Sequence, residues 1–156
     1  MTDARVPPGR HARFRAEATA VHEAADALEA FCTAEHLPSE AVWPLQVALD
    51  EIVANIIHHG PGDPESGGFD VWFSRIGDLV EIVVADDGPA FDPLARADPD
   101  VELPLDARQP GGLGIMLVKS LMDDVRYERR DRNILTLRKR VSRGGADSDE
   151  DPAERT

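Results

Sequence analysis

The stretch that decides the fold is LQVALDEIVANIIHHG, residues 45–60. Its apolar residues recur every three or four positions: Leu45, Ala48, Leu49, Ile52, Val53, Ile56 and Ile57. This period predicts an amphipathic helix with one apolar face. Gly60 and Pro61 end the helix, and His58 and His59 fall in its last turn, where cationic character is tolerated. We therefore expect a central helix on which the rest of the chain is organised.

Glu51 and Asn55 stand against the apolar stripe of this helix. They are four residues apart, so their side chains leave the same face, one turn above the other. A carboxylate placed this way can orient or deprotonate a nucleophile, and a carboxamide can bind a hard cation. The alternative is that both side chains are simply solvated, which is the commoner situation for polar residues on a helix surface. For the helix by itself, the solvated alternative is favoured.

The composition is typical of one globular domain. The chain has 156 residues, 42% of them apolar, so it can bury a core and fold. It has no run of about 18 apolar residues that could span a membrane, and residues 1–15 lack the apolar segment of a secretory signal. Cys32 is the single cysteine, which excludes an internal disulfide and a cysteine metal cluster and fits a reducing, cytoplasmic location. The net charge of −13 argues against a general nucleic-acid binder and allows a protein partner with a basic patch.

Two elements are expected before the central helix. Residues 11–18 alternate in polarity and predict a short strand at a sheet edge. A helix is expected from residue 20 to about residue 35, with Thr19 as its cap. Pro44 is expected in the first turn of the central helix or at its start.

The second half of the chain predicts two hairpins with a loop and a helix between them. The four strands are expected at residues 69–75, 79–85, 125–129 and 134–141. The first hairpin turns at Gly77 and Asp78, and the second turns at residues 131–133. Residues 91–110 are acidic and without periodicity, and they predict a long loop of the kind that forms a lid. A helix follows the glycines of residues 111–114.

The order of these elements predicts an α+β fold. We expect a two-layer α/β sandwich in which a mixed, mainly antiparallel sheet carries the helices on one face. Residues 11–141 are expected to form the folded domain. Residues 1–10 predict a flexible leader, and residues 142–156 predict a disordered acidic tail.

Two further segments have residues suited to ligand binding at the end of a predicted strand and at the start of a predicted helix. Asp86 and Gly88 follow a buried strand, where an ionised carboxylate needs a donor such as the exocyclic amine of a purine, and the glycine lets a flat ring approach. The glycines of residues 111–114 precede a helix, whose positive end and N–H groups suit an anion such as phosphate. Each segment has a plain alternative, an Asp-Gly turn or a flexible loop before a helix. Together with the pair on the central helix, they predict one ATP site suited to phosphoryl transfer.

In this order and at these separations, the three segments resemble the ATP-binding boxes of the GHKL (Bergerat-fold) superfamily. The N box is matched by Glu51-x-x-x-Asn55, the G1 box by Asp86-x-Gly88-x-x-Phe91, and the G2 box by Gly111-Gly112-Leu113-Gly114-Ile115. Within the superfamily, residues 11–141 resemble the bacterial anti-sigma factor serine/threonine kinases. The His-Ala that usually follows the N box is replaced by His58-His59-Gly60. One of these histidines can face the nucleotide, although a structural role at the helix end is the favoured interpretation.

The resemblance implies a role for each matched position. Asn55 would hold Mg²⁺ against the triphosphate, and Glu51 would be the catalytic residue that orients or deprotonates the attacking hydroxyl. Asp86 would accept from the adenine amine, with Gly88 beside it. The phosphates would meet the backbone at Gly112, Leu113 and Gly114, under a lid formed by residues 92–110, for which Phe91 would be a packing anchor.

The resemblance also implies an activity and partners. The protein would transfer phosphate from ATP to a serine or threonine of an anti-sigma factor antagonist, a STAS-type protein, and would sequester a sigma factor, often as a homodimer. Direct contact with nucleic acid or a membrane is not expected. Two alternatives keep the fold: a nucleotide-binding partner-switch module without kinase activity, and a regulator of a non-sigma output. Glu51 separates them from the kinase, because a module that only binds has no need of a base there.

Overall fold

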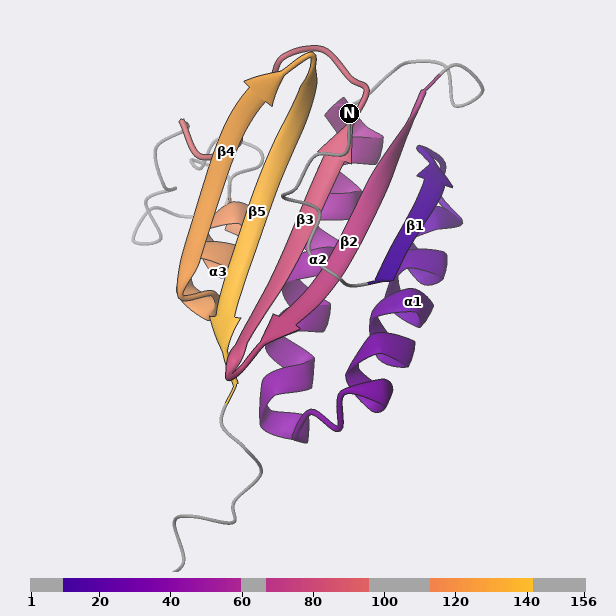
Figure 1. Ribbon diagram of the computed structural model, residues 1–156. Coiled ribbons are helices and arrows are strands. Elements are labelled where there is room, and N and C mark those ends of the chain that lie inside the picture. Colours follow the sequence, from indigo (N-terminus) through magenta and orange to yellow (C-terminus); the bar gives the residue numbers. More distant parts are fainter. Residues whose placement is uncertain (1–9, 60–66, 96–112, 142–156) are drawn as a thin grey trace, which may run out of the picture.

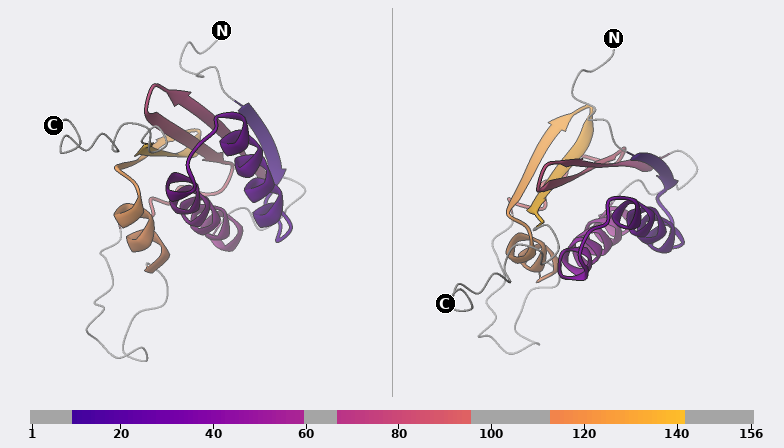
Figure 2. Two further views of the ribbon diagram at one scale, coloured as in Figure 1. Left: turned by 90° about the horizontal axis from the view of Figure 1, so that it is seen from below. Right: turned by 60° about the horizontal axis from the view of Figure 1, so that its bottom comes forward.

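The computed structural model describes residues 10–59, 67–95 and 113–141. The strands are β1 (Arg10–Arg15), β2 (Gly68–Ile76), β3 (Leu79–Asp86), β4 (Asp124–Arg130) and β5 (Arg132–Arg140). The helices are α1 (Ala20–Ala34), α2 (Ser39–His59) and α3 (Leu113–Leu121). The three helices lie behind the sheet in Figure 1, and Figure 2 shows that they form one layer on one face of it. The predicted α+β sandwich with helices on one face is confirmed.

The sheet has five strands in the order β1-β2-β3-β5-β4. Every pairing between the described strands is antiparallel, whereas the sequence predicted a mixed, mainly antiparallel sheet. The connection through α3 accounts for this difference. It carries the chain from β3 to β4 at the edge of the sheet, so the β4–β5 hairpin returns β5 into the gap beside β3, running against it.

The core lies between the sheet and the helices, and alternation along the strands places it there. In β2, Phe69, Val71 and Phe73 are fully buried against the helices, while the residues between them face the other side of the sheet. On α2, six of the seven apolar residues of the predicted stripe are buried, with Leu49 and Val53 fully covered, and Ile57 is partly buried. Each such side chain contributes about 1.5–3 kcal/mol by leaving water. This burial fixes which face of α2 is left for polar residues.

Two local predictions about helix starts are wrong. Pro44 lies inside α2, which begins at Ser39, and not in its first turn. Proline at this position removes a backbone hydrogen-bond donor, which destabilises the helix. Its ring is buried in the core, and this burial contributes stabilising free energy. Thr19 stands at the N-cap of α1 without capping it, because its hydroxyl donates to Glu17 Oε1 at 3.3 Å.

The two hairpin turns differ in how well they were predicted. Gly77 and Asp78 form the β2–β3 turn as expected, and Gly77 has a φ of 61° that suits glycine. The β4–β5 turn is tighter than the predicted 131–133, because Asp131 alone takes the left-handed conformation, with a φ of 61°. Arg132 and Asn133 therefore belong to β5, and Asn133 is 5% exposed. This shift brings Asn133 into the site described below.

Several predicted segments lie outside the described residues. They are the tail (residues 142–156), most of the predicted lid (residues 96–110) and the leader, apart from Arg10, which begins β1. None of the described helices is both long and apolar enough to cross a membrane.

Candidate functional site

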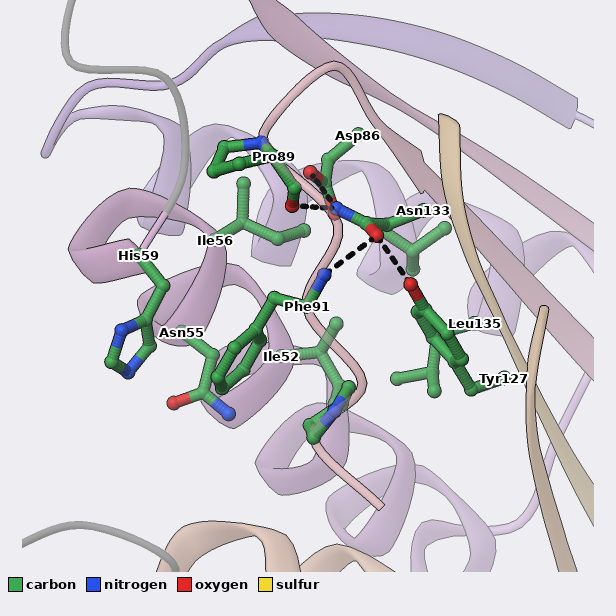
Figure 3. Close-up of a pocket in the computed structure, with 12 residues that line it drawn as sticks. Ile52, Asn55, Ile56, His59, Asp86, Pro89, Phe91, Tyr127, Asn133 and Leu135 are labelled. Atoms are coloured by element: carbon green, nitrogen blue, oxygen red, sulfur yellow. Dashed lines mark hydrogen bonds between the residues drawn. The ribbon is translucent and has the colours of Figure 1, made fainter. Parts of the chain in front are cut away.

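A pocket lies where α2, the carboxyl end of β3 and the β4–β5 hairpin meet (Figure 3). It has a volume of about 440 Å³, part of it open to solvent. The lining residues are Ile52, Asn55, Ile56, His59, Val84, Asp86, Pro89, Phe91, Pro93, Tyr127, Asn133 and Leu135. Most of these side chains are apolar or aromatic, and the polar ones are few. Such a lining suits a flat, largely apolar ring that carries a small number of polar groups.

Two of the predicted site residues, Asn55 and Asp86, line this pocket from different elements. Asn55 reaches it from α2 because its neighbours Ile52 and Ile56 are buried on the adjoining face of the helix. Asp86 is the last residue of β3, and its register with Phe69 and Asn133 turns it toward the helices. The sequence prediction that these two segments share a cavity is therefore correct.

Asp86 is held at one of its two carboxylate oxygens. Its Oδ1 accepts from the backbone N–H of Gly88 at 2.9 Å and from Asn133 Nδ2 at 3.0 Å. Oδ2 has no donor among the described residues. Gly88 thus lies beside Asp86, as predicted, and fixes the turn that follows β3. A partly buried carboxylate with one vacant oxygen is suited to accept a hydrogen bond from a ligand.

Glu51 lies one turn before Asn55 on α2 and is not among the pocket residues. Its carboxylate rests against Gly114 in the first turn of α3. A Cβ on Gly114 would overlap Glu51 Oε2 and lie 2.9 Å from Glu51 Cδ. Gly114 therefore leaves room for the carboxylate beside the start of α3. This places the predicted base next to the predicted phosphate-binding helix.

Leu113 and Gly112 are the other predicted phosphate contacts of the glycine box. Leu113 is the first residue of α3 and is 48% exposed. Gly112 lies outside the described residues. Its predicted contact with phosphate, together with that of Leu113 and Gly114, remains a prediction.

His59 and Phe91 form a stacked pair at the pocket, with ring centroids 4.6 Å apart and planes 20° from parallel. His59 lines the pocket, so it contributes to the cavity wall as well as ending α2. Both histidines lie in the last turn of α2, as predicted, and the place of His59 in the pocket wall keeps open the alternative that it faces the nucleotide. Phe91, expected as an anchor for a lid, forms part of the pocket wall and is 38% exposed.

Asp87 is the neighbour of Asp86 and points to the opposite face of the sheet. Its carboxylate accepts from Arg13 Nη2 at 2.8 Å, Arg132 Nε at 2.7 Å and the Gly68 N–H at 3.1 Å. Burial acts to raise the pKa of Asp87, but the donors and positive charges around it outweigh burial and lower the pKa below its ordinary value. Asp87 therefore has a structural role on the outer face.

Asp70 of β2 extends this cluster on the outer face. It accepts from Arg13 Nη1 and Arg132 Nη2, each at 2.7 Å, and His11 Nε2 lies 2.7 Å from its Oδ1. Burial raises the pKa of Asp70 less than these three partners lower it, so the net shift is downward. We call Asp70, Asp87, Arg13, Arg132 and His11 the outer ion cluster. It ties β1, β2, β5 and the segment after β3 together.

The donor set at the pocket fits magnesium held mainly by phosphates. The described residues contain no group of three histidine, cysteine, aspartate or glutamate side chains that could hold a metal. Mg²⁺ keeps several waters and commonly takes one or two protein oxygens together with substrate phosphates. The Asn55 amide oxygen at the pocket wall is an oxygen ligand of this type.

Asn133 and Tyr127 are the polar pocket residues that sequence reasoning missed. Asn133 followed Asp131 and Arg132, a combination typical of a turn, and was assigned to that turn. The signal that could have found it is the strand register, since Asn133 pairs with Asp86 across β3 and β5. That register is a long-range property, which local patterns do not contain.

Comparisons with known proteins give a consistent family. Residues 14–139 match the family described as the histidine kinase-like ATPase domain. The serine-protein kinase RsbW of Oceanobacillus iheyensis is 30% identical over 122 residues, which cover 75% of this chain and 77% of that protein. The serine/threonine-protein kinase BtrW of Bordetella bronchiseptica is 33% identical over 123 residues, covering 73% of this chain and 85% of BtrW.

Solved structures show the same fold. The structure of the RsbU and RsbW domains of Rv1364c from Mycobacterium tuberculosis is similar over 87% of this chain, with a TM-score of 0.65 and 20% identity. This chain spans 33% of that longer protein. The SiaB–SiaC complex from Pseudomonas aeruginosa contains a chain with a TM-score of 0.54 and 17% identity over 85% of this chain. At these identities the likeness concerns the fold alone.

Proposed function

The chain belongs to the histidine kinase-like ATPase family, and from this premise we propose that it is an ATP-dependent serine/threonine protein kinase and anti-sigma regulator. The family predicted from the three sequence boxes is confirmed by the family match and by the RsbW relative. The enzyme class agrees with the names of both relatives, which are serine or serine/threonine protein kinases. ATP use follows from the family, and the roles of individual residues described below are part of the proposal.

The observation that carries the proposal is the convergence of Asn55 and Asp86 on one largely apolar pocket. The adenine ring would lie between the apolar walls, and its exocyclic amine would donate to Asp86 Oδ2. Gly88 keeps the turn beside Asp86 free of a side chain. A purine with a donor at this position matches both the shape and the vacant acceptor.

The triphosphate would extend from the pocket toward α3. Asn55 would supply an oxygen to Mg²⁺, and the ion, when bound, neutralises charge on the phosphates. The backbone of Gly112, Leu113 and Gly114 would contact the phosphates, helped by the positive end of α3.

Glu51 is the residue we assign to catalysis. Its carboxylate lies one helical turn from Asn55 and against Gly114, so a hydroxyl approaching the phosphates would come within its reach. It would accept the proton of the attacking seryl or threonyl hydroxyl, or orient that hydroxyl in line with the bond that breaks. The structure gives the carboxylate no hydrogen-bond donor among the described residues, so it is available for this role.

The partners we propose are proteins. The hydroxyl would belong to an anti-sigma factor antagonist of STAS type, and a sigma factor would be sequestered when the antagonist is phosphorylated. Exchange between the two partners would regulate transcription without direct contact of this chain with nucleic acid. The protein would act in the cytoplasm, where ATP and sigma factors are found, and a homodimer is the form we expect to hold the sigma factor.

Phosphate transfer from labelled ATP to the antagonist encoded nearest to this protein's gene tests the proposal. We expect transfer by the wild type, loss of transfer in Glu51→Ala, and transfer near the wild-type level in the control Glu81→Ala, whose side chain pairs with Arg138 away from the pocket. Stable complex formation without transfer would contradict the kinase and favour the module that only binds.

A thermal shift with Mg-ATP tests the nucleotide site separately. Binding to the folded state alone should add roughly 2.7 kcal/mol of stability at a hundredfold excess over the dissociation constant. Glu51→Ala should keep this shift, because Glu51 is not part of the pocket. If the wild type shows no shift, the ATP assignment is wrong.

A further inference from the structure

We propose that β4 is an interaction surface for a second copy of this chain, and that the two β4 strands pair antiparallel, edge to edge. The proposed function expects a homodimer but assigns no surface to it, and the edge of β4 supplies one. The association of two copies can be measured without ATP, so this interface stands or fails separately from the kinase.

β4 is the outermost strand of the sheet, whose order is β1-β2-β3-β5-β4. One side of its backbone pairs with β5, and no described strand pairs with the other side (Figure 1). Every second residue of such an edge strand presents its N–H and C=O groups away from the sheet, where another strand can bind them. Four of the seven residues of β4 are exposed. The strand is therefore accessible for pairing along most of its length.

The charged side chains on one face of β4 alternate in sign. Val125 and Tyr127 pack against the core on the helix side, so the residues before, between and after them face the other side of the sheet. The side chains of these outward residues are between 39% and 70% exposed. In chain order the outward residues are Asp124, Arg126, Glu128 and Arg130.

Antiparallel pairing of two β4 strands about a two-fold axis at Tyr127 would place each outward charge opposite a charge of the other sign. Asp124 would lie opposite the second copy's Arg130, and Arg126 would lie opposite the second copy's Glu128. The symmetry repeats both pairs, so four pairs of opposite charge form. Opposite charges that face each other across antiparallel strands stabilise the pairing.

The same pattern of signs excludes the neighbouring registers. A shift of two residues in one direction would set Arg126 opposite the second copy's Arg126, and Asp124 opposite its Glu128. A shift in the other direction would set Glu128 opposite Glu128 and Arg126 opposite Arg130. Like charges directly opposite each other destabilise a pairing. Because a shift of one residue would turn outward side chains to the wrong face, only the register centred on Tyr127 is favoured.

The arginines of β4 have donors left for these additional partners. Arg126 Nε donates to Asp124 Oδ2 at 2.8 Å. Arg130 Nε lies 3.0 Å from Glu128 Oε2. Both contacts use Nε alone, and the terminal nitrogens of the two side chains have no acceptor among the described residues. Arg130 is also directly opposite Arg132 of β5, and the second copy's Asp124 would offset this like-charge pair.

The other edge of the sheet has a different charge pattern. The outward residues of β1 are His11, Arg13 and Arg15, and none of them is acidic. Antiparallel pairing of two β1 strands would therefore set basic side chains against each other in any register. Charges of one sign are a common protection of edge strands against pairing. β1 is thus protected against a second copy, whereas β4 is complementary to one.

Sedimentation equilibrium of the full chain over a range of concentrations tests this interface. We expect the wild type to form a dimer. Arg126→Glu and Glu128→Arg should each weaken the dimer by about tenfold or more, because each sets like charges opposite each other at two places. The double variant Arg126→Glu/Glu128→Arg should regain the wild-type affinity. An equimolar mixture of the two single variants should also associate, because each variant restores the charge pairs of the other.

Arg15→Glu is the matched control, because it makes the same charge change on an exposed residue of the opposite edge. It should leave the dimer affinity unchanged, and thermal unfolding should show that all variants remain folded. A wild type that stays monomeric contradicts the β4 interface, and so does a dimer that the single variants do not weaken. A double variant that stays as weak as the single variants also contradicts it. Phosphate transfer by a monomeric wild type would leave the proposed function intact.

Discussion

Asp86 and Asp87 are adjacent in the chain, yet they occupy opposite faces of the sheet and have different surroundings. Asp87 has both carboxylate oxygens occupied by Arg13, Arg132 and the Gly68 N–H. Asp86 has one oxygen occupied by Gly88 and Asn133 and the other without a donor among the described residues. The protein thus supplies hydrogen-bond donors to both carboxylate oxygens of Asp87. It supplies donors to only one oxygen of Asp86, which lines the pocket.

The difference gives a criterion: a structural carboxylate has hydrogen-bond donors from the protein at both oxygens, and a ligand-binding carboxylate has one oxygen without such a donor. Asp70 belongs with Asp87, since three side chains from β1 and β5 surround it. Glu51 belongs with Asp86, because it also has no donor among the described residues although it lies beside α3. Substitutions on the outer face should therefore change stability, and substitutions on the pocket side should change binding or turnover.

The largest effect is expected from Asp86→Asn, measured as the affinity for ATP. The Asn133 donor would take the amide oxygen, and the amide nitrogen would then face the adenine amine, so two donors would oppose each other. Affinity should fall by about 100-fold, with a small change in melting temperature. Asp87→Asn is the matched control and should keep ATP affinity. Equal losses in the two variants would remove the distinction between the faces.

The next largest effect is expected from Arg132→Ala, measured as the free energy of unfolding. Arg132 donates to Asp70, to Asp87 and to the Ala85 carbonyl, and its removal leaves Asp70 with fewer partners in a site that exposes 9% of its side chain. We expect a loss of about 2 kcal/mol, or roughly 4–8 °C in melting temperature, while ATP affinity changes little. A stable variant that binds ATP poorly would reverse the assignment of the outer ion cluster.

Gly114→Ala should have a smaller effect, seen in phosphate transfer. The added methyl group would displace the Glu51 carboxylate, which lies where that group must go. The turnover number should fall by about tenfold, and the affinity for ATP should fall less. Leu117→Ala is a control on the same helix, because Leu117 is 41% exposed and removing its side chain leaves Glu51 in place. Unchanged turnover in Gly114→Ala would mean that the position of Glu51 is not important for transfer.

The smallest effect is expected in the pH dependence of the free energy of unfolding. Asp70 and Asp87 have pKa values lowered from the ordinary 3.8 in the folded state. Their contribution to stability is therefore present above that ordinary value and is lost as the pH falls through the lower, folded pKa. Denaturation followed from roughly pH 6 to pH 3 should show a loss that is smaller in Asp87→Asn than in the wild type. An identical pH dependence in both proteins would show that Asp87 is not linked to folding.

The sequence predicts the helix-bearing sandwich well, because periodicity and turn residues are local signals. The stripe of residues 45–60 placed Asn55 correctly, and the acid after a buried strand placed Asp86 correctly. Asn133 was assigned to the turn because asparagine after Asp131 is typical of one, and only the pairing of β3 with β5 shows where it points. The roles of Glu51, Leu113 and the glycines depend on the ligand, and they remain predictions.

Pro44 in α2 has a consequence for how the molecule opens. It deprives the Glu40 carbonyl of its usual helical donor, so the turn from Ser39 to Trp43 is joined to the rest of α2 by fewer backbone bonds. Glu51 and Asn55 lie beyond this break, on the part of the helix whose apolar residues Ile52, Val53 and Ile56 are buried. Amide hydrogens in the first turn should exchange with solvent sooner than those around Ile52, and fraying at that end would leave the site-bearing half intact.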